Sequence, residues 1–392
     1  MLNEPKRSKI VLGVDVGGTY TDVFFLNEID GSCDTAKVPS TRADQSIGIQ
    51  TGITQNLETL SEVSLLIHGT TVGTNALLER KGAKTGIITT KGFRDVIEMR
   101  RRDRPETWGL WGIFEPIVSR ELRIEVDERI LADGTVHTQL KPNDVKSSAE
   151  TLLARGAEAV CVFFMNSYAN DINEKLAVKT LKKIWPNNHI TSSSEILPEI
   201  REFERCSTAT LNAYLQPPVA NYLARIEDRI QEKNETTKIL IVQSNGGVMS
   251  IETAKSRPIK TALSGPAAGV VAAREIASVA GFDNIITGDM GGTSFDVSLV
   301  ANGQNMLTAQ ANIDFGMTIR TPMIEMTTIG AGGGSIAKID KTGFLEIGPE
   351  SAGSFPGPVC YGLGNARPTV TDANLVLGRI DARNPIGGKQ SK

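Results

Sequence analysis

The chain has 392 residues, a length that predicts two domains, since a single hydrophobic core rarely serves so long a chain. Its content of 40% apolar and 22% charged residues is typical of a globular protein. Its net charge of −3 lacks the basic surplus that nucleic acids and acidic membranes attract, so we expect neither as a partner.

The cysteines and the N-terminus indicate where the chain resides. Cys33, Cys161, Cys206 and Cys360 are far apart and, with three histidines, offer no metal-ligand spacing, which fits a reduced intracellular protein. No apolar run approaches the roughly 20 residues of a membrane span. The first nine residues lack the apolar core and cleavage site of a signal peptide. We therefore expect a cytoplasmic location.

In the first half of the chain, strands and helices are predicted to alternate. Apolar runs predict strands over residues 10–16, 22–26, 65–67, 84–89 and 159–164. Helical patterns occupy residues 74–80 and 149–155. This alternation predicts βα units around a largely buried sheet, hence an α/β fold.

The second half begins at a predicted boundary, where three serines precede Pro198 within residues 192–199. We expect a first lobe over residues 1–195 and a second over 196–392. A helical stretch over 202–232 should be interrupted at Pro217 and Pro218, because proline removes a helical hydrogen bond. Strands are predicted over 238–243 and 284–287, and dense glycine and proline from residue 330 onward predict a loop-rich tail.

One short motif occurs twice. Asp15-Val-Gly-Gly-Thr-Tyr-Thr-Asp-Val aligns with Asp289-Met-Gly-Gly-Thr-Ser-Phe-Asp-Val, and each copy lies between two β-rich runs. Each copy therefore predicts a hairpin with Asp-x-Gly-Gly-Thr at its tip. Neither copy is a Walker loop or a GxGxxG fingerprint, because both lack the GK[ST] ending and the following helix.

Such a tip suits phosphate. Adjacent glycines allow close approach of backbone N–H groups to phosphate oxygens, and a threonine hydroxyl adds a donor. The phosphate-binding residues would be Gly17, Gly18, Thr19, Gly291, Gly292 and Thr293. Asp15 or Asp289 can hold Mg²⁺ through water or orient a nucleophile, and two tips can grip β- and γ-phosphates from opposite sides. The alternative is two unrelated hairpins with glycine turns.

Two glycine-rich segments are further candidates for a nucleotide site. The loop Gly330-Ala-Gly-Gly-Gly-Ser335 can receive an adenosine through Gly330, Gly332, Gly333 and Gly334, or can be a plain turn. Residues 263–273 combine a Ser-Gly-Pro turn with a helix of small side chains. This segment predicts either a hinge between lobes or ordinary close helix packing.

Three polar segments have both a functional and a structural interpretation. His68, Thr70, Thr71 and Asn75 lie at a strand-to-helix junction, where they can meet a polar substrate or cap the helix, although capping leaves His68 unexplained. The basic run 100–104 before Trp108 and Trp111 predicts either a solvated face or a contact with an anionic substrate or partner. The segment 372–374 predicts a wall of the cleft or a helix N-cap.

Five segments, at 14–22, 68–82, 288–296, 330–337 and 367–378, resemble the hydantoinase A/5-oxoprolinase family. The resemblance extends over nearly the whole chain. It implies the two-lobed α/β ATPase fold of the actin/Hsp70/sugar-kinase superfamily, which is ribonuclease H-like, with ATP and Mg²⁺ as cofactors. It also implies that the two tips are phosphate loops, that 265–269 is a hinge and that 330–334 is an adenosine loop.

The resemblance implies an activity as well. Members include ATP-dependent N-methylhydantoinase, 5-oxoprolinase and the ATP-using subunits of acetone and acetophenone carboxylases, which share phosphorylation of a carbonyl or amide oxygen. In the implied mechanism Asp15 holds Mg²⁺ through water and Asp289 orients the acceptor oxygen or water. A hydantoinase B-type subunit usually completes the reaction, so we expect a hetero-oligomer.

Two departures from the family pattern stand out. Glu325 and Thr327 occupy the stretch before the glycine-rich loop where many relatives carry aspartate and often histidine. Chains of the family also continue past the position that corresponds to Lys392, so we expect a truncated chain. The leading hypothesis is an ATP-dependent cyclic amidase subunit. The alternatives are the activating subunit of an acetone- or acetophenone-type carboxylase and a non-catalytic Hsp70-like module driven by ATP.

Overall fold

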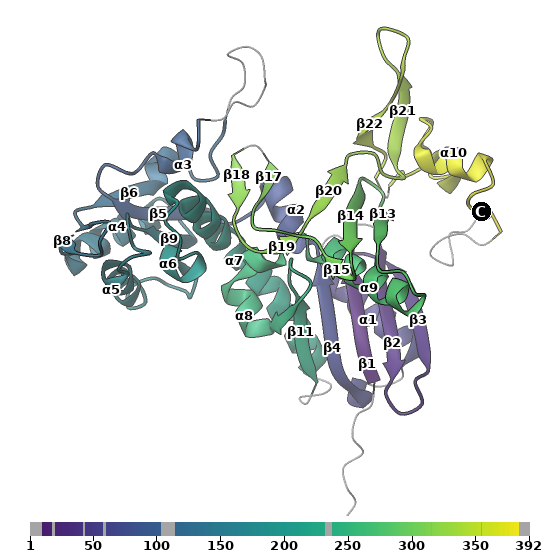
Figure 1. Ribbon diagram of the computed structural model, residues 1–392, viewed down its shortest axis with the longest axis horizontal. Coiled ribbons are helices and arrows are strands. Elements are labelled where there is room, and N and C mark those ends of the chain that lie inside the picture. The colour runs from purple at the N-terminus through teal and green to yellow at the C-terminus, as the bar shows by residue number, and fades with distance from the viewer. Residues whose placement is uncertain are drawn as a thin grey trace, which may run out of the picture.

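The computed structural model describes residues 10–17, 20–41, 44–57, 60–102, 114–231, 237–314, 316–353 and 355–383. Figure 1 shows two α/β regions side by side, one around β1 to β4 and one around β5 and β9, with a third region of strands β13, β14 and β20 beside the first. We call the first two regions together the first lobe and the third region the second lobe. Gly18, Thr19, Trp108, Trp111 and residues 384–392 lie outside the described residues.

The largest sheet belongs to the first lobe and has the strand order β12-β11-β4-β1-β2-β3. Its strands are β1 (Ile10–Val16), β2 (Tyr20–Asn27), β3 (Cys33–Pro39), β4 (Val63–Thr70), β11 (Lys238–Val242) and β12 (Val248–Ser250). β1 pairs antiparallel with β2 and parallel with β4. The strands predicted over 10–16, 22–26, 65–67 and 238–243 are therefore confirmed.

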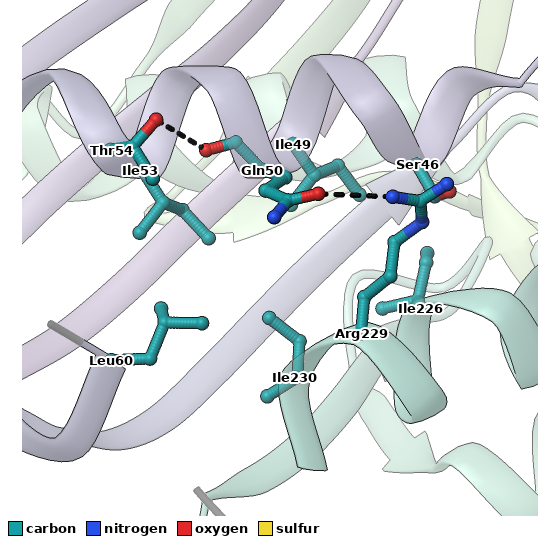
Figure 2. Close-up of a pocket in the computed structure, with 9 residues that line it drawn as sticks. All are labelled: Ser46, Ile49, Gln50, Ile53, Thr54, Leu60, Ile226, Arg229 and Ile230. Carbon is teal, nitrogen blue, oxygen red and sulfur yellow. Dashed lines mark hydrogen bonds between the residues drawn. The ribbon is translucent and has the colours of Figure 1, made fainter. Parts of the chain in front are cut away.

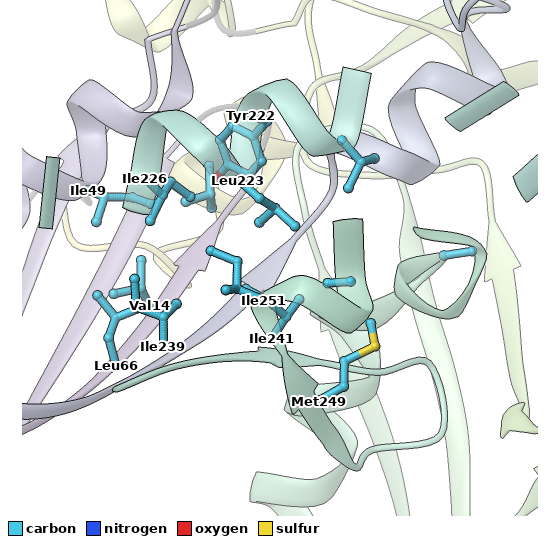
Figure 3. Packing of buried hydrophobic residues seen from close by; sticks show 14 of the residues in the cluster. Val14, Ile49, Leu66, Tyr222, Leu223, Ile226, Ile239, Ile241, Met249 and Ile251 are labelled. Carbon is cyan, nitrogen blue, oxygen red and sulfur yellow. The ribbon is translucent and has the colours of Figure 1, made fainter. Parts of the chain in front are cut away.

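One face of this sheet is covered by α1 (Gln45–Asn56) and by the second half of α7 (Glu202–Gln231). Ile49 of α1 and Leu223 of α7 belong to the same buried cluster as Val14 of β1 (Figure 3). Alternate residues of β1 enter this core because side chains alternate across a strand. The same alternation turns Asp15 to the other face, away from this core; its side chain keeps surface open to water although surrounding protein groups partly enclose the carboxyl.

A second, parallel sheet has the order β10-β9-β5-β6. Its strands are β5 (Thr85–Thr90), β6 (Arg123–Val126), β9 (Ala159–Phe163) and β10 (Ile190–Ser192). The helices α4 (Pro142–Ala154) and α5 (Ile172–Leu181) pack against it. Every residue of β9 is buried, as expected for a strand covered on both faces. The predicted strands over 84–89 and 159–164 and the helix over 149–155 are confirmed.

The prediction that a proline pair interrupts the helix over 202–232 is wrong. α7 runs without a break for 30 residues, with Pro217 and Pro218 inside it. A proline at position 218 offers no N–H to the carbonyl of Tyr214, four residues earlier. That carbonyl instead accepts the N–H of Ala83 at 3.0 Å. A tertiary hydrogen bond thus replaces the lost helical one. It joins α7 to the segment just before β5, the strand that begins at Thr85.

α7 connects the two cores of the first lobe. Cys206, Ala209 and Ala213 in its first half belong to the buried cluster around the parallel sheet. The second half contributes to the cluster of the largest sheet. Tertiary packing at both ends keeps the helix continuous through the prolines. Since β11 and β12 join the sheet of β1–β4 from beyond residue 195, that sheet spans the predicted division into 1–195 and 196–392, which stays a prediction.

The second lobe is built on β13 (Ile285–Met290), β14 (Phe295–Ala301), β15 (Gln304–Asn305) and β20 (Met326–Ile329). α9 (Ser264–Val279) packs on one face of this sheet through Ala267 and Val270. The tail predicted to be loop-rich also contains a hairpin and a helix: β21 (Ser335–Ile339), β22 (Leu345–Ser351) and α10 (Val370–Val376).

The hairpin of β17 (Ala311–Asp314) and β18 (Met317–Ile319) returns from the second lobe to α7. Met317 and Ile319 are buried in the core of the first lobe, and Ser207 of α7 donates to the carbonyl of Thr318 at 2.8 Å. This hairpin fastens the two lobes to each other.

The remaining elements are short: α2 (Val72–Leu78), α3 (Val96–Met99), α6 (Ser193–Ile196), α8 (Ile251–Ser256), β7 (Arg129–Ile130), β8 (Val136–Thr138), β16 (Leu307–Thr308) and β19 (Met323–Ile324). The helix predicted over 74–80 corresponds to α2, and the strand predicted over 284–287 corresponds to β13. Within the described ranges no helix combines the length and apolar character needed to cross a membrane.

Replacing Gly82 with alanine should destabilise the junction of the two sheets. An added Cβ would stand 2.1 Å from the ring of Tyr214, so the ring or the backbone must move. We expect the free energy of unfolding to fall by about 1–3 kcal/mol, measured by urea denaturation. Gly269→Ala in α9 is the control, since its Cβ would meet nothing within 4 Å. Equal losses in both variants would contradict this packing.

Candidate functional site

The two copies of the repeated motif form matching hairpins. In the first, Asp15 pairs with Asp22 across β1 and β2, and in the second, Asp289 pairs with Asp296 across β13 and β14. The same hydrogen bond closes both tips. The N–H of Gly17 donates to the carbonyl of Tyr20 at 3.0 Å, and the N–H of Gly291 donates to the carbonyl of Ser294 at 2.9 Å. The hairpins predicted from the repeat are therefore present.

Asp15 lies where three elements converge. A Cβ on Gly69, at the end of β4, would lie 3.4 Å from the Asp15 Oδ1 atom, and a Cβ on Gly265 would lie 3.3 Å from the same atom. Gly265 belongs to the first turn of α9, which begins at Ser264. The absence of side chains at both glycines lets the end of β4 and the start of α9 approach the carboxylate.

The charges of the two tips influence each other. Partial burial and then the negative charges of Asp22 and Asp289 together raise the pKa of Asp15 to about 6, against the lowering effect of Lys37. The pKa of Asp289 is also raised, first by burial and then by Asp296 and Asp22. Asp289 of the second lobe is thus one of the charges that act on Asp15 of the first lobe, whereas a joint grip of the two tips on phosphates stays a prediction.

A second pair of acids accompanies the first and was not singled out by sequence reasoning. Asp22 forms an ion pair with Lys37 at 2.7 Å. Thr328 donates to Asp296 at 2.6 Å. Both aspartates lie at the same offset in the repeat, which was the available signal. Their partners on β3 and β20 are distant in sequence, so only the folded sheets reveal them.

The glycine-rich loop packs directly on the second tip. The N–H of Gly333 donates to the carbonyl of Gly291 at 2.8 Å, and that of Gly334 donates to the carbonyl of Gly292 at 2.7 Å. A Cβ on Gly332 would lie 2.6 Å from the backbone of Thr293. The glycines are thus required by the close approach of two backbones. Gly330 faces open space at its Cβ position.

The polar segment at the end of β4 and the start of α2 forms hydrogen bonds with β1, the strand that leads to the first tip. His68 and Thr70 are fully buried. The Nδ1 atom of His68 bonds the Val14 carbonyl at 3.3 Å, and Thr71 donates to the Val16 carbonyl at 3.0 Å. Asn75 donates to the Thr71 hydroxyl at 3.4 Å. Burial lowers the pKa of His68 to about 4, so the ring is neutral. A substrate role for these four residues stays a prediction.

Asp372 acts as a structural cap in this structure. Thr369 and Asp372 form a capping box at the start of α10. Asp372 also accepts the N–H of Cys360 at 2.8 Å and holds the preceding turn. These contacts match the N-cap interpretation of the segment 372–374.

Comparisons with known protein families identify the family of the chain. The family model of the Hydantoinase/oxoprolinase N-terminal region matches residues 11–185, and the Hydantoinase/oxoprolinase model matches residues 205–391. The chain belongs to the hydantoinase/oxoprolinase family. Its fold is the two-lobed α/β ATPase fold of the actin/Hsp70/sugar-kinase superfamily, as predicted.

Individual relatives align over most of this hydantoinase/oxoprolinase chain. It is 37% identical to the caprolactamase subunit alpha of Pseudomonas jessenii, covering 96% of this chain and 56% of that one. It is 35% identical to the acetophenone carboxylase gamma subunit of Aromatoleum aromaticum, covering 96% and 54%. The crystal structure of the ATP-dependent caprolactamase from P. jessenii matches with a TM-score of 0.83 at 36% identity, covering 96% and 56%. The chain spans about half the length of these curated relatives.

The donor set between the lobes fits a magnesium ion that arrives with phosphates. Mg²⁺ in proteins is commonly held by one or two carboxylates together with phosphate oxygens and water. Asp15 and Asp289 supply such carboxylates, and their mutual repulsion would be relieved by a divalent cation. Across the described residues no cluster of three or more His, Cys, Asp or Glu side chains forms a metal cage.

Two other features lie apart from the tips in this hydantoinase/oxoprolinase fold. Arg101 of the basic run forms an ion pair with Glu204 of α7, and the guanidinium of Arg100 lies 4.3 Å from the centre of the Phe114 ring. Arg104 lies outside the described residues. Figure 2 shows a narrow apolar pocket between α1 and α7, where Arg229 donates to Gln50 at 3.0 Å. None of its lining residues belongs to a tip.

Asp15→Asn should stabilise the chain in a pH-dependent way. A folded-state pKa of about 6, above the ordinary 3.8, means that the folded protein prefers the neutral carboxyl. Protonation of Asp15 therefore adds to the free energy of unfolding. This gain is present near pH 4 and is lost as the pH rises through 6, where the carboxyl of the folded protein ionises. The melting temperature of Asp15→Asn should thus exceed that of the wild type at pH 7.5 and approach it near pH 4. Asp34→Asn on β3 is the control, and a gain that is equal at both pH values would contradict the shift.

Proposed function

We propose that this chain binds Mg·ATP between its two Asp-x-Gly-Gly-Thr tips and transfers the γ-phosphoryl group to the carbonyl oxygen of a cyclic amide such as a hydantoin, a lactam or 5-oxoproline. The observation that carries the proposal is the pair of matching hairpin tips, each with an aspartate at its start and a glycine N–H that closes the turn. One relative is named as a caprolactamase, and the matching family is named hydantoinase/oxoprolinase. Both names refer to the hydrolysis of cyclic amides.

In this proposal the phosphates lie against the two tips. Backbone N–H groups and hydroxyls of Gly17, Gly18, Thr19, Gly291, Gly292 and Thr293 would donate to phosphate oxygens. Asp15 would hold Mg²⁺ through water, and the ion, when bound, would reduce the negative charge of the phosphates. The start of α9 at Ser264 adds the positive end of a helix dipole beside Asp15. The loop from Gly330 to Gly334 would receive the adenosine.

Phosphoryl transfer would activate the amide for ring opening. The γ-phosphorus forms a bond to the amide oxygen while its bond to the bridging oxygen breaks, and ADP leaves. Water then adds to the activated carbon and the C–N bond breaks, so that the nitrogen leaves as an amine with the proton of the water and the carbon becomes an acyl phosphate. A second water adds to the acyl carbon, and phosphate leaves with the former amide oxygen to give the acid. Asp289 would orient the acceptor oxygen or the water, aided by its raised pKa. Positioning and electrostatics supply most of the rate in such transfers.

The same proposal extends to the residues near the substrate, the partner subunit and the cellular location. Thr71 and Asn75, which are partly buried beside the first tip, would approach the substrate, while the buried His68 and Thr70 would act through their neighbours. A hydantoinase B-type subunit would complete ring opening in a hetero-oligomer, since the relatives are named as subunits. We propose a cytoplasmic location from the cysteine usage.

A second candidate is the activating subunit of an acetophenone-type carboxylase. The 35% identity to the acetophenone carboxylase gamma subunit favours it. Release of phosphate from ATP separates the two functions. Stimulation by caprolactam, hydantoin or 5-oxoproline would support the amidase, whereas stimulation by a ketone with bicarbonate would support the carboxylase. ATP hydrolysis indifferent to all of these and altered by peptides would favour an Hsp70-like module.

Asp289→Ala should abolish substrate-stimulated phosphate release while leaving the fold intact. Removal of a group that orients the nucleophile costs about 10²–10⁴-fold in rate. Circular dichroism checks the fold, and Asp34→Ala on the exposed part of β3 serves as a control for the loss of one negative charge. Turnover at the wild-type rate in Asp289→Ala would refute the role of this carboxylate.

Asp15→Ala should weaken the binding of ATP in the presence of Mg²⁺ and have little effect in its absence, because the variant lacks the carboxylate proposed to hold the ion. Isothermal calorimetry with and without Mg²⁺ measures the difference. We expect a loss of about tenfold or more in Mg²⁺-dependent affinity. An unchanged affinity would count against Asp15 as the magnesium residue.

A further inference from the structure

Asp15 is held by side chains that bond the carbonyl groups on both sides of it. His68 bonds the Val14 carbonyl at 3.3 Å, and Thr71 donates to the Val16 carbonyl at 3.0 Å. The two clamping residues lie in the parallel neighbour β4 and the turn that follows it, where His68 is in register with Val14. The backbone that carries Asp15 is therefore fixed one residue before and one residue after it.

The clamp continues to α7 through Tyr222. The Tyr222 hydroxyl lies 2.9 Å from the Nε2 atom of His68, and both residues are almost fully buried. Thr70, next to the clamp, also hydrogen-bonds Tyr222. Figure 3 shows Tyr222 on α7 close to the apolar cluster around Val14. A residue of the longest helix thus acts on the strand that carries Asp15.

The donors and acceptors of this chain of bonds have one consistent arrangement. A carbonyl oxygen only accepts, so the Nδ1 atom of His68 carries the proton. Because burial lowers the pKa of His68 to about 4, its ring is neutral, and the Nε2 atom must accept from Tyr222. Burial likewise raises the pKa of Tyr222 well above its usual range, so the phenol keeps its proton. Every polar atom in the clamp is satisfied.

We propose that His68 and Tyr222 are positioning residues for Asp15, which fix the carboxylate between Gly69 and Gly265 through the Val14 carbonyl. This role rests on the proposed function only in that Asp15 is taken to hold the Mg²⁺ that accompanies ATP. It differs from the substrate contact predicted for His68, because no atom of the buried imidazole reaches the cleft. α7, which passes through both cores of the first lobe, thereby influences the first phosphate tip.

Two kinds of substitution separate positioning from simple packing. Tyr222→Phe removes one hydroxyl and keeps the ring. His68→Leu removes the bond to Val14, whereas His68→Asn keeps a donor at the position of Nδ1. Tyr214→Phe, on the same helix and also buried, is the matched control, since Tyr214 packs against Gly82 and not against the clamp.

The first measurement does not depend on nucleotide. Nitrogen-15 spectra should show His68 as the neutral Nδ1–H tautomer from pH 5.5 to 8, and a ring that titrates near pH 6.5 would overturn the clamp. The backbone amide resonances of Asp15 and Val16 should shift and exchange faster with solvent in His68→Leu, because the strand loses its bond to the Val14 carbonyl. Tyr222→Phe and His68→Asn, which both lose the contact between Tyr222 and His68, should cause a smaller change of the same kind, and Tyr214→Phe should cause none.

The second measurement uses Mg·ATP. Tyr222→Phe should reduce Mg²⁺-dependent ATP affinity about 3- to 10-fold, as expected for one buried hydrogen bond, with no effect on ATP binding without Mg²⁺. A variant that lowers only the melting temperature, with the amide exchange of Asp15 and Val16 and the Mg²⁺ dependence unchanged, would show a purely structural role and overturn the proposal. If the wild-type chain binds no ATP, the proposed function fails, while the amide exchange and the His68 tautomer still decide the clamp.

Discussion

The gathering of acidic side chains around Asp15, where the charges of Asp22 and Asp289 both raise its pKa, is the constraint on which the rest of the site depends. Each lobe places one acid at the start of a hairpin tip, and each acid is made less acidic by burial and by neighbouring negative charge. Maintaining such a pair costs stability in the absence of a cation. Lys37 offsets part of this cost through its ion pair with Asp22. In the proposed function, Mg·ATP would bring the cation that compensates this unfavourable arrangement of negative charges.

Close approach between backbones brings the acids to their places. Gly69 and Gly265 allow β4 and α9 to reach the carboxylate of Asp15, and Gly332 allows the glycine-rich loop to reach the second tip. At each of these positions an added side chain would fill space next to a tip or collide with it. The hairpin of β17 and β18 then fastens the second lobe to the first through Met317 and Ile319, which are buried in the core of the first lobe.

The repeat was the most informative part of the sequence. It predicted both hairpins and the position of each aspartate, because the turn is a local property of Asp-Gly-Gly-Thr between two β-rich runs. The prolines of α7 were misjudged for the opposite reason. Their cost is local, but the compensating bond from Ala83 to Tyr214 comes from a segment distant in sequence. The chemistry of the family came from the resemblance, and the family comparisons confirmed the family and the fold.

The sequence by itself determined the α/β class, most of the strands, the two tips and the family, because these depend on local turn chemistry, on apolar periodicity and on long motifs. Only the tertiary structure decided what His68 contacts, that Lys37 pairs with Asp22 and that the glycine-rich loop seats on the second tip. Those contacts join residues from separate strands and helices. Burial and neighbouring charge, which set the pKa of Asp15, exist only after both lobes have folded around it.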